Sequence, residues 1–250
     1  MDLNLIVCQI GLIFGHIFKK MKVQHCSLIL TVALLFLLLS CKEEVKNRVE
    51  PAAIGSVYVR YLNPEGYYTV QVEFGEQLSD SLLRKPDWKS VPAFNRILLQ
   101  EKPRSEFTRF YAGEFLATYQ KDMTVDLIHC PKGLQKVNLS LTQPNLVITN
   151  KKIISSNDFT FSLQDEQLLQ SEETLVILLI DEKQQGVNLE IKGPQPDNEF
   201  VIPAGFTNNL SRGNLELNLI KKKIYSLKEG KSKILINLEH YSPPIILNLQ

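Results

Sequence analysis

Apolar and polar side chains alternate along most of this chain with a period of two residues. In the first such stretch, Val57, Val59 and Tyr61 alternate with Tyr58 and Arg60. Successive side chains of a β-strand point to opposite faces, so this period is typical of strands that bury one face. No stretch of the same region carries the apolar stripe at helical spacing that an amphipathic helix needs. The pattern predicts an all-β fold.

Turn signals separate the alternating stretches. Residues 63–66 read Asn-Pro-Glu-Gly between the first stretch and a second at 68–74, which predicts a β-hairpin. Residues 175–180 are apolar at every position and predict a central strand covered on both faces. Many short strands with turn chemistry between them are typical of β-sandwiches. We therefore expect two tandem immunoglobulin-like β-sandwich domains, 53–142 and 143–250.

Basic and acidic residues nearly balance. There are 28 Lys and Arg against 27 Asp and Glu, a formal charge of +1. Non-specific affinity for nucleic acid rests on excess positive charge, so we expect no nucleic-acid partner. The basic run at 221–223 is expected to end a strand at solvent.

The chain begins with two apolar stretches. Met21 and Lys22 precede an apolar run at 28–39, and the small Ser40 stands before Cys41, which predicts a secretory signal peptide. The preceding residues 1–20 are also largely apolar. They have two interpretations: an N-terminal membrane segment, or sequence upstream of a true start at Met21. We prefer the second, because a signal peptide starting at Met21 is well formed by itself.

The sequence Leu-Leu-Leu-Ser-Cys at 37–41 resembles the lipobox of bacterial lipoproteins. The resemblance implies cleavage of residues 1–40, a diacylglyceryl group on the Cys41 thiol and acylation of the new amine. It also implies a membrane anchor, because several acyl chains hold a protein where one chain does not. Leu39 departs mildly from the small residue usual at its position. The alternative is a signal anchor in which Cys41 is incidental.

The residues after the cysteine are charged and predict a solvated tether at 41–52. Lys42, Glu43 and Glu44 also resemble the lysine-plus-acidic export tag of surface lipoproteins of the Bacteroidetes group. That resemblance implies the outer membrane and its outer surface, with the periplasmic face as the alternative. Ser81, within Asp-Ser-Leu, resembles the short O-glycosylation site of secreted proteins of the same group.

The sequence contains few signs of catalytic chemistry. Neither a zinc-protease pair of histidines nor the Gly-x-Ser-x-Gly nucleophile motif occurs. His129 and His240 are expected to be strand-end residues, so no metal site, no catalytic residue and no cofactor beyond the lipid on Cys41 is predicted. Adjacent carboxylates at 172–173 and 181–182 keep one alternative open, because carboxylates that converge in the fold could catalyse hydrolysis.

Tyrosine and arginine recur in the first predicted domain, and both are enriched in recognition surfaces. The candidate binding surface consists of Tyr58, Arg60, Tyr67, Arg104 and Arg109. Other tyrosines of this region, Tyr61, Tyr68 and Tyr111, fit a core-facing alternation equally well.

The sequence thus favours a non-enzymatic, lipid-anchored envelope protein. It would act by binding or spacing, with the membrane as one partner and a protein or glycan of unknown identity as the other. Two alternatives stay open: a carbohydrate-processing or other hydrolytic lipoprotein, and a structural subunit of a fimbrial or gliding-type assembly.

Overall fold

The computed structural model describes residues 52–63, 65–79, 82–87, 91–127, 135–148, 151–164 and 168–250. Within these ranges the chain is all-β, with strands and connecting loops and no α-helix, as predicted. Residues 51–250 form one compact unit. The part of the chain that the structure describes holds no helix long and apolar enough to cross a membrane.

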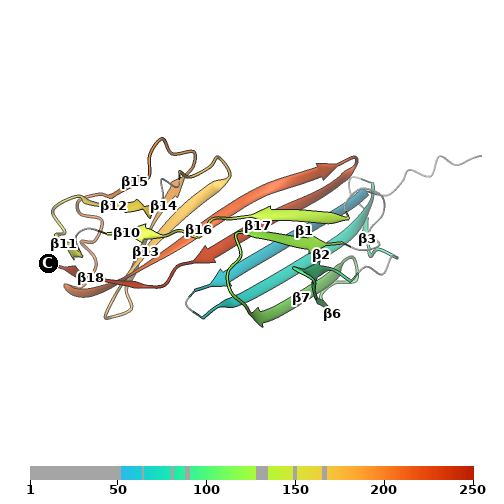
Figure 1. Ribbon diagram of the computed structural model, residues 1–250, viewed down its shortest axis with the longest axis horizontal. Helices are drawn as coiled ribbons and strands as arrows, with labels where there is room; N and C mark the ends of the chain where they lie inside the picture. Colours follow the sequence, from blue (N-terminus) through green and yellow to red (C-terminus); the bar gives the residue numbers. More distant parts are fainter. Residues whose placement is uncertain are drawn as a thin grey trace, which may run out of the picture. The chain divides into compact units, whose positions relative to one another are not determined.

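One large sheet contains eleven of the strands and extends through the whole unit (Figure 1). Its main path consists of β11 (Lys152–Ile153), β18 (Ile245–Leu249), β16 (Gly213–Glu229), β17 (Ser232–Tyr241), β1 (Ala52–Leu62), β2 (Tyr67–Ser79), β7 (Arg109–Leu116) and β6 (Gln100–Lys102). Three strands lie beside this path: β13 (Glu173–Asp181) next to β16, β14 (Gly186–Lys192) next to β13, and β3 (Leu82–Arg84) next to β2.

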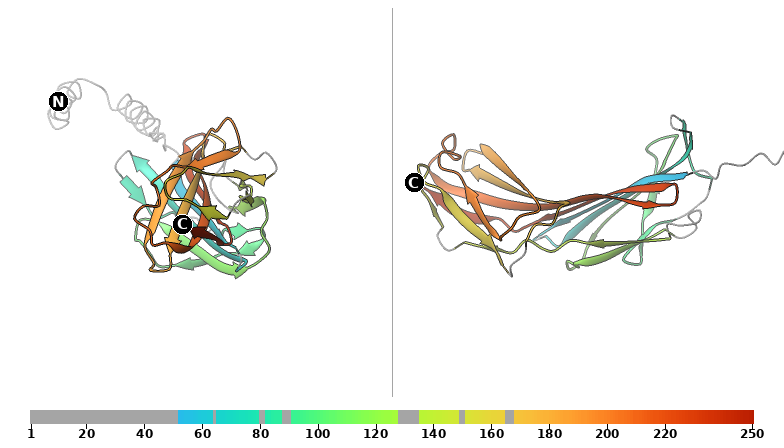
Figure 2. Two further views of the ribbon diagram at one scale, coloured as in Figure 1. Left: turned by 90° about the vertical axis from the view of Figure 1, so that its left-hand side faces the viewer. Right: turned by 90° about the horizontal axis from the view of Figure 1, so that it is seen from above.

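Two smaller sheets complete the unit. One has the order β5 (Ile97–Leu98), β4 (Ala93–Phe94), β8 (Asp122–Asp126), β9 (Lys136–Ser140). The other has the order β10 (Leu146–Val147), β12 (Phe159–Leu163), β15 (Glu199–Ile202). Each faces a different part of the large sheet, and the long strand β16 runs from one part to the other (Figure 2).

The first hydrophobic core lies between the large sheet and the sheet of β4, β5, β8 and β9. It contains the buried residues of β1, β2 and β7 together with those of β4, β8 and β9. The predicted core tyrosines Tyr61, Tyr68 and Tyr111 are among them, at 6%, 1% and 1% exposure, so the core interpretation of these three is confirmed. We call this half of the unit the first sandwich.

The second hydrophobic core lies between the large sheet and the sheet of β10, β12 and β15. Leu215, Leu217 and Leu219 of β16 belong to it, whereas Tyr225 and Leu227 further along the same strand pack against the first core. All five have odd numbers, so they point to one face of β16. Both cores therefore use the same face of the large sheet. We call this half the second sandwich.

The predicted hairpin forms as β1 and β2, whose antiparallel register pairs Val57 with Val72 and Val59 with Val70. Gly66, in the turn between them, has a φ of +63°, a left-handed conformation that glycine adopts without a steric penalty. Local turn chemistry and period-two alternation were enough to identify this element.

The strand at 175–180 also forms, as part of β13, and it is central because β14 and β16 pair with its two edges. Only one of its faces is covered by another sheet. Leu175, Ile177 and Leu179 are fully buried in the second core, whereas Leu178 and Ile180, on the opposite face, are half-exposed. The expectation of cover on both faces was therefore too strong.

The two cores do not coincide with the two predicted domains. β17, at 232–241, pairs in parallel with β1, from Ile54 opposite Lys233 to Leu62 opposite Tyr241. Ile234, Ile236 and Leu238 of this strand are buried in the first core. A boundary at 142/143 therefore separates β1 from a strand on which the first core depends. Sequence spacing could not reveal this pairing, because it joins residues about 180 positions apart.

A fragment limited to 53–142 tests this arrangement. It lacks β17 and the three side chains that β17 adds to the first core, and it exposes one edge of β1. We expect the fragment to show no cooperative unfolding transition in urea by circular dichroism, whereas residues 51–250 should show one. A cooperative transition in the short fragment would contradict the dependence on β17.

Candidate functional site

Three of the five predicted surface residues lie on one face of the first sandwich. Val57 and Val59 of β1 point into the core, so Tyr58 and Arg60 point to the opposite face of the large sheet. Tyr67 joins them, because it pairs with Leu62 on the same face. We call this surface, built on β17, β1, β2 and β7 and turned away from the first core, the outer face.

Carboxylates of neighbouring strands hold the tyrosines of the outer face. Tyr58 Oη donates a hydrogen bond to Glu239 Oε2 at 2.8 Å, and Tyr241 Oη donates to the same oxygen at 3.2 Å. Tyr67 Oη donates to Glu114 Oε2 at 2.7 Å. Burial and the hydrogen bond to Glu239 raise the pKa of the Tyr58 hydroxyl, so Tyr58 remains a donor at neutral pH.

Two polar atoms of the outer face lack partners within the described residues. The Arg60 Nε donor and the Asn237 Oδ1 acceptor are both buried without a hydrogen bond. Arg60 does donate from Nη2 to Thr69 Oγ1, at 3.3 Å. Because Tyr58 pairs with Asn237 in the register of β1 and β17, the two open atoms belong to adjacent strands. A donor and an acceptor are therefore left without hydrogen bonds beneath the surface of this face.

Arg104 extends the outer face, whereas Arg109 does not belong to it. Arg104 Nη1 lies 3.5 Å from Glu73 Oε2, and its guanidinium stacks over the Phe110 ring at 4.7 Å. Arg109 pairs with the core residue Phe74 and so points to the other face. There its Nε donates to the Pro86 carbonyl at 3.0 Å, which is a structural role. Grouping Arg109 with the binding surface was wrong, because strand alternation sends it to the opposite side.

A shallow hollow of about 350 Å³ opens beside Tyr67 on the outer face. Polar and apolar side chains both line it, and one carboxylate, Glu114, is among them. The lining residues are Thr69, Gln71, Ile97, Leu98, Gln100, Lys102, Ala112, Gly113, Glu114 and Phe115. Amides, a hydroxyl and one charge of each sign offer hydrogen bonds in several directions, which suits a polar ligand with an apolar side.

Besides the outer face, a cluster of buried polar residues lies where the large sheet passes from one core to the other. Lys221 and Glu173, at 1% and 4% exposure, form an ion pair with 3.0 Å between Nζ and Oε2. Lys221 Nζ also donates to Thr142 Oγ1 at 2.7 Å. Thr142 lies in the segment between β9 and β10. This hydrogen bond therefore holds the segment that connects one small sheet to the other. We call Lys221, Glu173, Thr142 and His240 the junction cluster.

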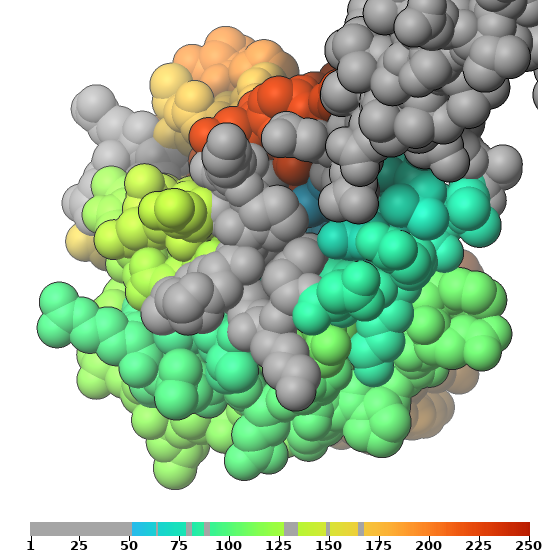
Figure 3. Space-filling model, turned by 90° about the vertical axis from the view of Figure 1, so that its right-hand side faces the viewer, coloured from blue at the N-terminus to red at the C-terminus, as the bar shows by residue number. Residues whose placement is uncertain are grey.

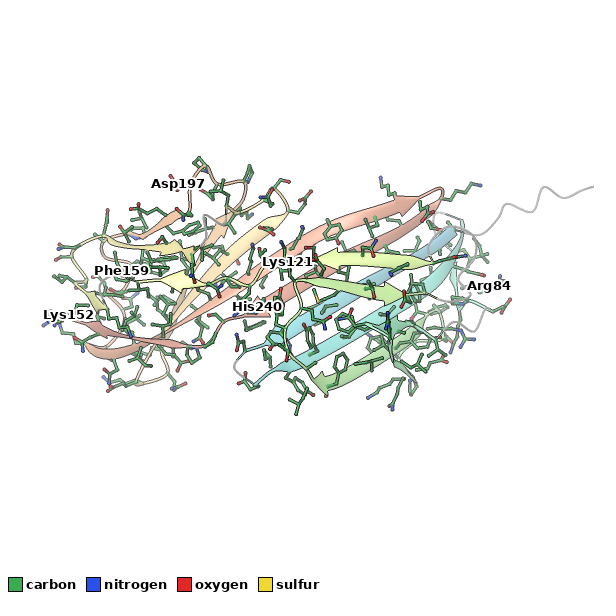
Figure 4. The ribbon with its side chains drawn as sticks, in the orientation of Figure 1. Arg84, Lys121, Lys152, Phe159, Asp197 and His240 are labelled. Carbon is green, nitrogen blue, oxygen red and sulfur yellow. The ribbon has the colours of Figure 1, made fainter. Side chains whose placement is uncertain are left out.

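His240 is fully buried in the junction cluster, near the middle of the unit (Figure 4). Its ring lies edge-on against Tyr119 at 4.5 Å and contacts Tyr61 at 5.3 Å. Neither ring nitrogen has a partner among the described residues. Burial, with a smaller contribution from the nearby Lys221 charge, lowers the pKa of His240 to about 4, so the imidazole is neutral at pH 7.

One sequence interpretation fails at the junction cluster. Lys221 does not end a strand at solvent, because it lies inside β16 with its side chain in the core face. His240 is near a strand end, as expected, but fully buried. Both positions continue a core-facing alternation, after Leu219 in β16 and after Leu238 in β17. The alternation of core-facing and outward-facing side chains along each strand was therefore the signal that could have identified Lys221 and His240 as buried.

One carboxylate of each adjacent pair, Glu173 of 172–173 and Asp181 of 181–182, has a structural role. Glu173 is held by Lys221, and Asp181 accepts hydrogen bonds from the backbone amides of Lys183, Gln185 and Ser211. These backbone bonds, led by the one from Ser211, lower the pKa of Asp181. Across the described ranges, no group of three His, Cys, Asp or Glu side chains is placed to hold a metal ion.

The predictions that concern Cys41, Lys42, Glu43, Glu44, Ser81 and His129 fall outside the described residues. No family model matches the chain, and no curated protein matches it.

Breaking the ion pair of the junction cluster should destabilise the fold. Either Lys221→Met or Glu173→Gln leaves one buried charged group without its partner, and we expect each to lower the free energy of unfolding by about 3–5 kcal/mol. The double variant Lys221→Met/Glu173→Leu should recover most of that loss. Urea denaturation of the four proteins measures these differences.

Lys222→Met is the matched control, because Lys222 points to the outer face and lies 3.6 Å from Glu239. Removing this half-exposed lysine should cost less than about 1 kcal/mol. Equal losses for Lys221→Met and Lys222→Met would contradict a special role for the buried pair.

His240 should make the fold sensitive to mild acid. Its pKa is lowered from 6.5 to about 4 in the folded state, so between these values the unfolded chain binds a proton that the folded chain does not. Stability is then lost as the pH falls from 6.5 towards 4, by at most about 3 kcal/mol from this group. His240→Phe should flatten this part of the pH profile in urea titrations. If His240→Phe leaves the pH dependence of stability unchanged, His240 is not the cause of the loss in mild acid.

Proposed function

We propose that the protein is a lipid-anchored cell-envelope protein that acts by binding or spacing rather than by catalysis. The observation that carries the proposal is the Leu-Leu-Leu-Ser-Cys sequence at 37–41. The signal peptide would be removed as residues 1–40, and Cys41 would carry the lipid. The outer membrane of a Gram-negative bacterium is the proposed location, with the cell surface favoured by Lys42, Glu43 and Glu44.

The fold is compatible with a folded unit on a tether. The first strand begins at Ala52, eleven positions after Cys41, and the charged residues between them can remain in water. From Ala52 onward the chain forms one compact unit that runs to its last residue. We include in this proposal the immunoglobulin-like character of the two sandwiches, which rests on size and strand content.

The outer face of the first sandwich is the proposed binding surface. Tyr58, Tyr67 and Tyr241 are held by carboxylates, so they lose little conformational freedom when a partner binds. The exposed guanidinium of Arg104 adds a polar group on the same face. Such a mixture suits a protein or glycan partner.

Mass spectrometry of the mature N-terminus tests the anchor. For the protein expressed from its full sequence in a Gram-negative host, we expect a chain that starts at Cys41 and carries covalent lipid. Cys41→Ala should abolish the lipid mass and the association with membranes, whereas Cys130→Ala should retain both. Protease treatment of intact cells should release fragments of 52–250 if the unit is on the surface.

An unmodified Cys41 on a chain that keeps residues 1–40 would overturn the lipoprotein proposal. Lipid on Cys41 together with protection from protease in intact cells would instead place the unit on the periplasmic face.

A further inference from the structure

Three large apolar side chains are exposed at one end of the first sandwich. Leu78 and Leu82 flank the connection between β2 and β3, and Phe107 lies in the loop between β6 and β7. Their exposed fractions are 39%, 55% and 52%. Together with Leu83 they line an open hollow of about 380 Å³, which also contacts Arg84, Lys85 and Glu106. We call Leu78, Leu82, Leu83 and Phe107 the apolar tip; the end of the unit that carries β3 faces the viewer in Figure 3.

The two basic groups beside the apolar tip are paired with carboxylates. Arg84 Nη2 lies 2.6 Å from Glu76 Oε2, and Lys85 Nζ lies 3.7 Å from Glu101 Oε1. Asp87 and Glu106 add two further carboxylates, so the rim carries charges of both signs without an excess of positive charge. A partner attracted by charge alone would gain little here, whereas an apolar partner gains by covering the leucines and the phenylalanine.

The apolar tip lies at the end of the unit where the chain arrives from residue 51. The register of β1 and β2 pairs Ala52 with Gln77 and Ala53 with Glu76, directly before Leu78. Glu76 in turn pairs with Arg84 of β3. The first residues of the fold and the apolar tip are therefore neighbours across adjacent strands.

The length of chain before Ala52 limits how far this end can be from an anchor at Cys41. Eleven residues span at most about 40 Å when fully extended, and a flexible chain of this length averages about 20 Å between its ends. A tether of this length keeps the apolar tip at high local concentration near the surface that holds the lipid. Even a weak contact between the apolar tip and that surface would then be formed for much of the time.

We propose that the apolar tip contacts the lipid bilayer and seats Leu78, Leu82 and Phe107 at the boundary between headgroups and acyl chains. This inference rests on the proposed lipid anchor. Arg84 and Lys85 would remain at the headgroups, because their long side chains hold the charge away from the apolar end. Since the rim has no excess of positive charge, the contact depends on apolar burial and not on anionic lipid.

Quenching of tryptophan fluorescence tests the contact. Trp88 is the sole tryptophan of the chain and lies outside the described residues, so Trp88→Phe/Phe107→Trp moves the fluorophore to the apolar tip, and this protein is the unaltered protein of the comparison. The full-length protein is reconstituted into phosphatidylcholine vesicles with or without bromine on the acyl chains. We expect brominated lipid to quench this tryptophan, and the added change Leu78→Ser/Leu82→Ser to lose the quenching. Replacing part of the lipid with phosphatidylglycerol should change neither result.

Leu116→Ser is the matched control. Leu116 is 76% exposed and lies at the opposite end of β7, where it pairs with Tyr67. This variant removes as much exposed apolar surface and should retain full quenching. Circular dichroism of each variant verifies that the fold is unchanged.

Absence of quenching in the unaltered protein, or equal quenching in the double variant, would overturn the proposal. A double variant that loses self-association of the detergent-solubilised protein, with unchanged quenching, would assign the tip to a second copy instead.

The mass of the mature N-terminus distinguishes failure of the tip contact from failure of the lipid anchor. If Cys41 carries lipid and quenching is absent, only the tip contact is wrong. If Cys41 is unmodified, the anchor is wrong, and the quenching of the vesicle-bound protein still decides the contact.

Discussion

The parallel pairing of β17 with β1 is the interaction on which the rest of the unit depends. It fills one edge of the first strand and adds Ile234, Ile236 and Leu238 to the first core. The other edge of β17 pairs with the second half of β16, whose first half belongs to the second sandwich. One pair of strands near the end of the chain therefore joins the two cores into a single hydrogen-bonded sheet.

One face of the large sheet packs against both cores, and the junction cluster lies where the sheet passes from one core to the other. The core-facing row of β16 is apolar at Leu219 and again at Tyr225, and between them it carries Lys221. A buried ammonium is costly unless it is paired and hydrogen-bonded, and Glu173 and Thr142 supply both contacts. Lys221 thus ties the segment that crosses the sheet at this point to β16, because Thr142 of that segment accepts its hydrogen bond.

The two surfaces proposed to act lie on different parts of the first sandwich. The outer face carries tyrosines fixed by carboxylates, and the apolar tip lies beside the strand at which the fold begins. In the proposed arrangement, an anchor attached before Ala52 would leave the outer face along the side of the sandwich, where a partner could reach it. The proposed membrane contact of the apolar tip and the proposed binding at the tyrosine surface would therefore not exclude each other.

The sequence by itself determined the all-β class, the hairpin of β1 and β2 and the central position of β13. These follow from the apolar pattern and turn chemistry, which act between residues close in the chain. It grouped Tyr58, Arg60 and Tyr67 by residue type and left Tyr61, Tyr68 and Tyr111 open between core and surface, and the strand register then sent the first three to the outer face and the other three to the core. Only the tertiary structure decided that residues 232–241 complete the first sandwich, that Arg109 faces away from the binding surface and that Lys221 finds Glu173. Each of these depends on which distant strands pair, and pairing across 180 positions leaves no local trace in the sequence.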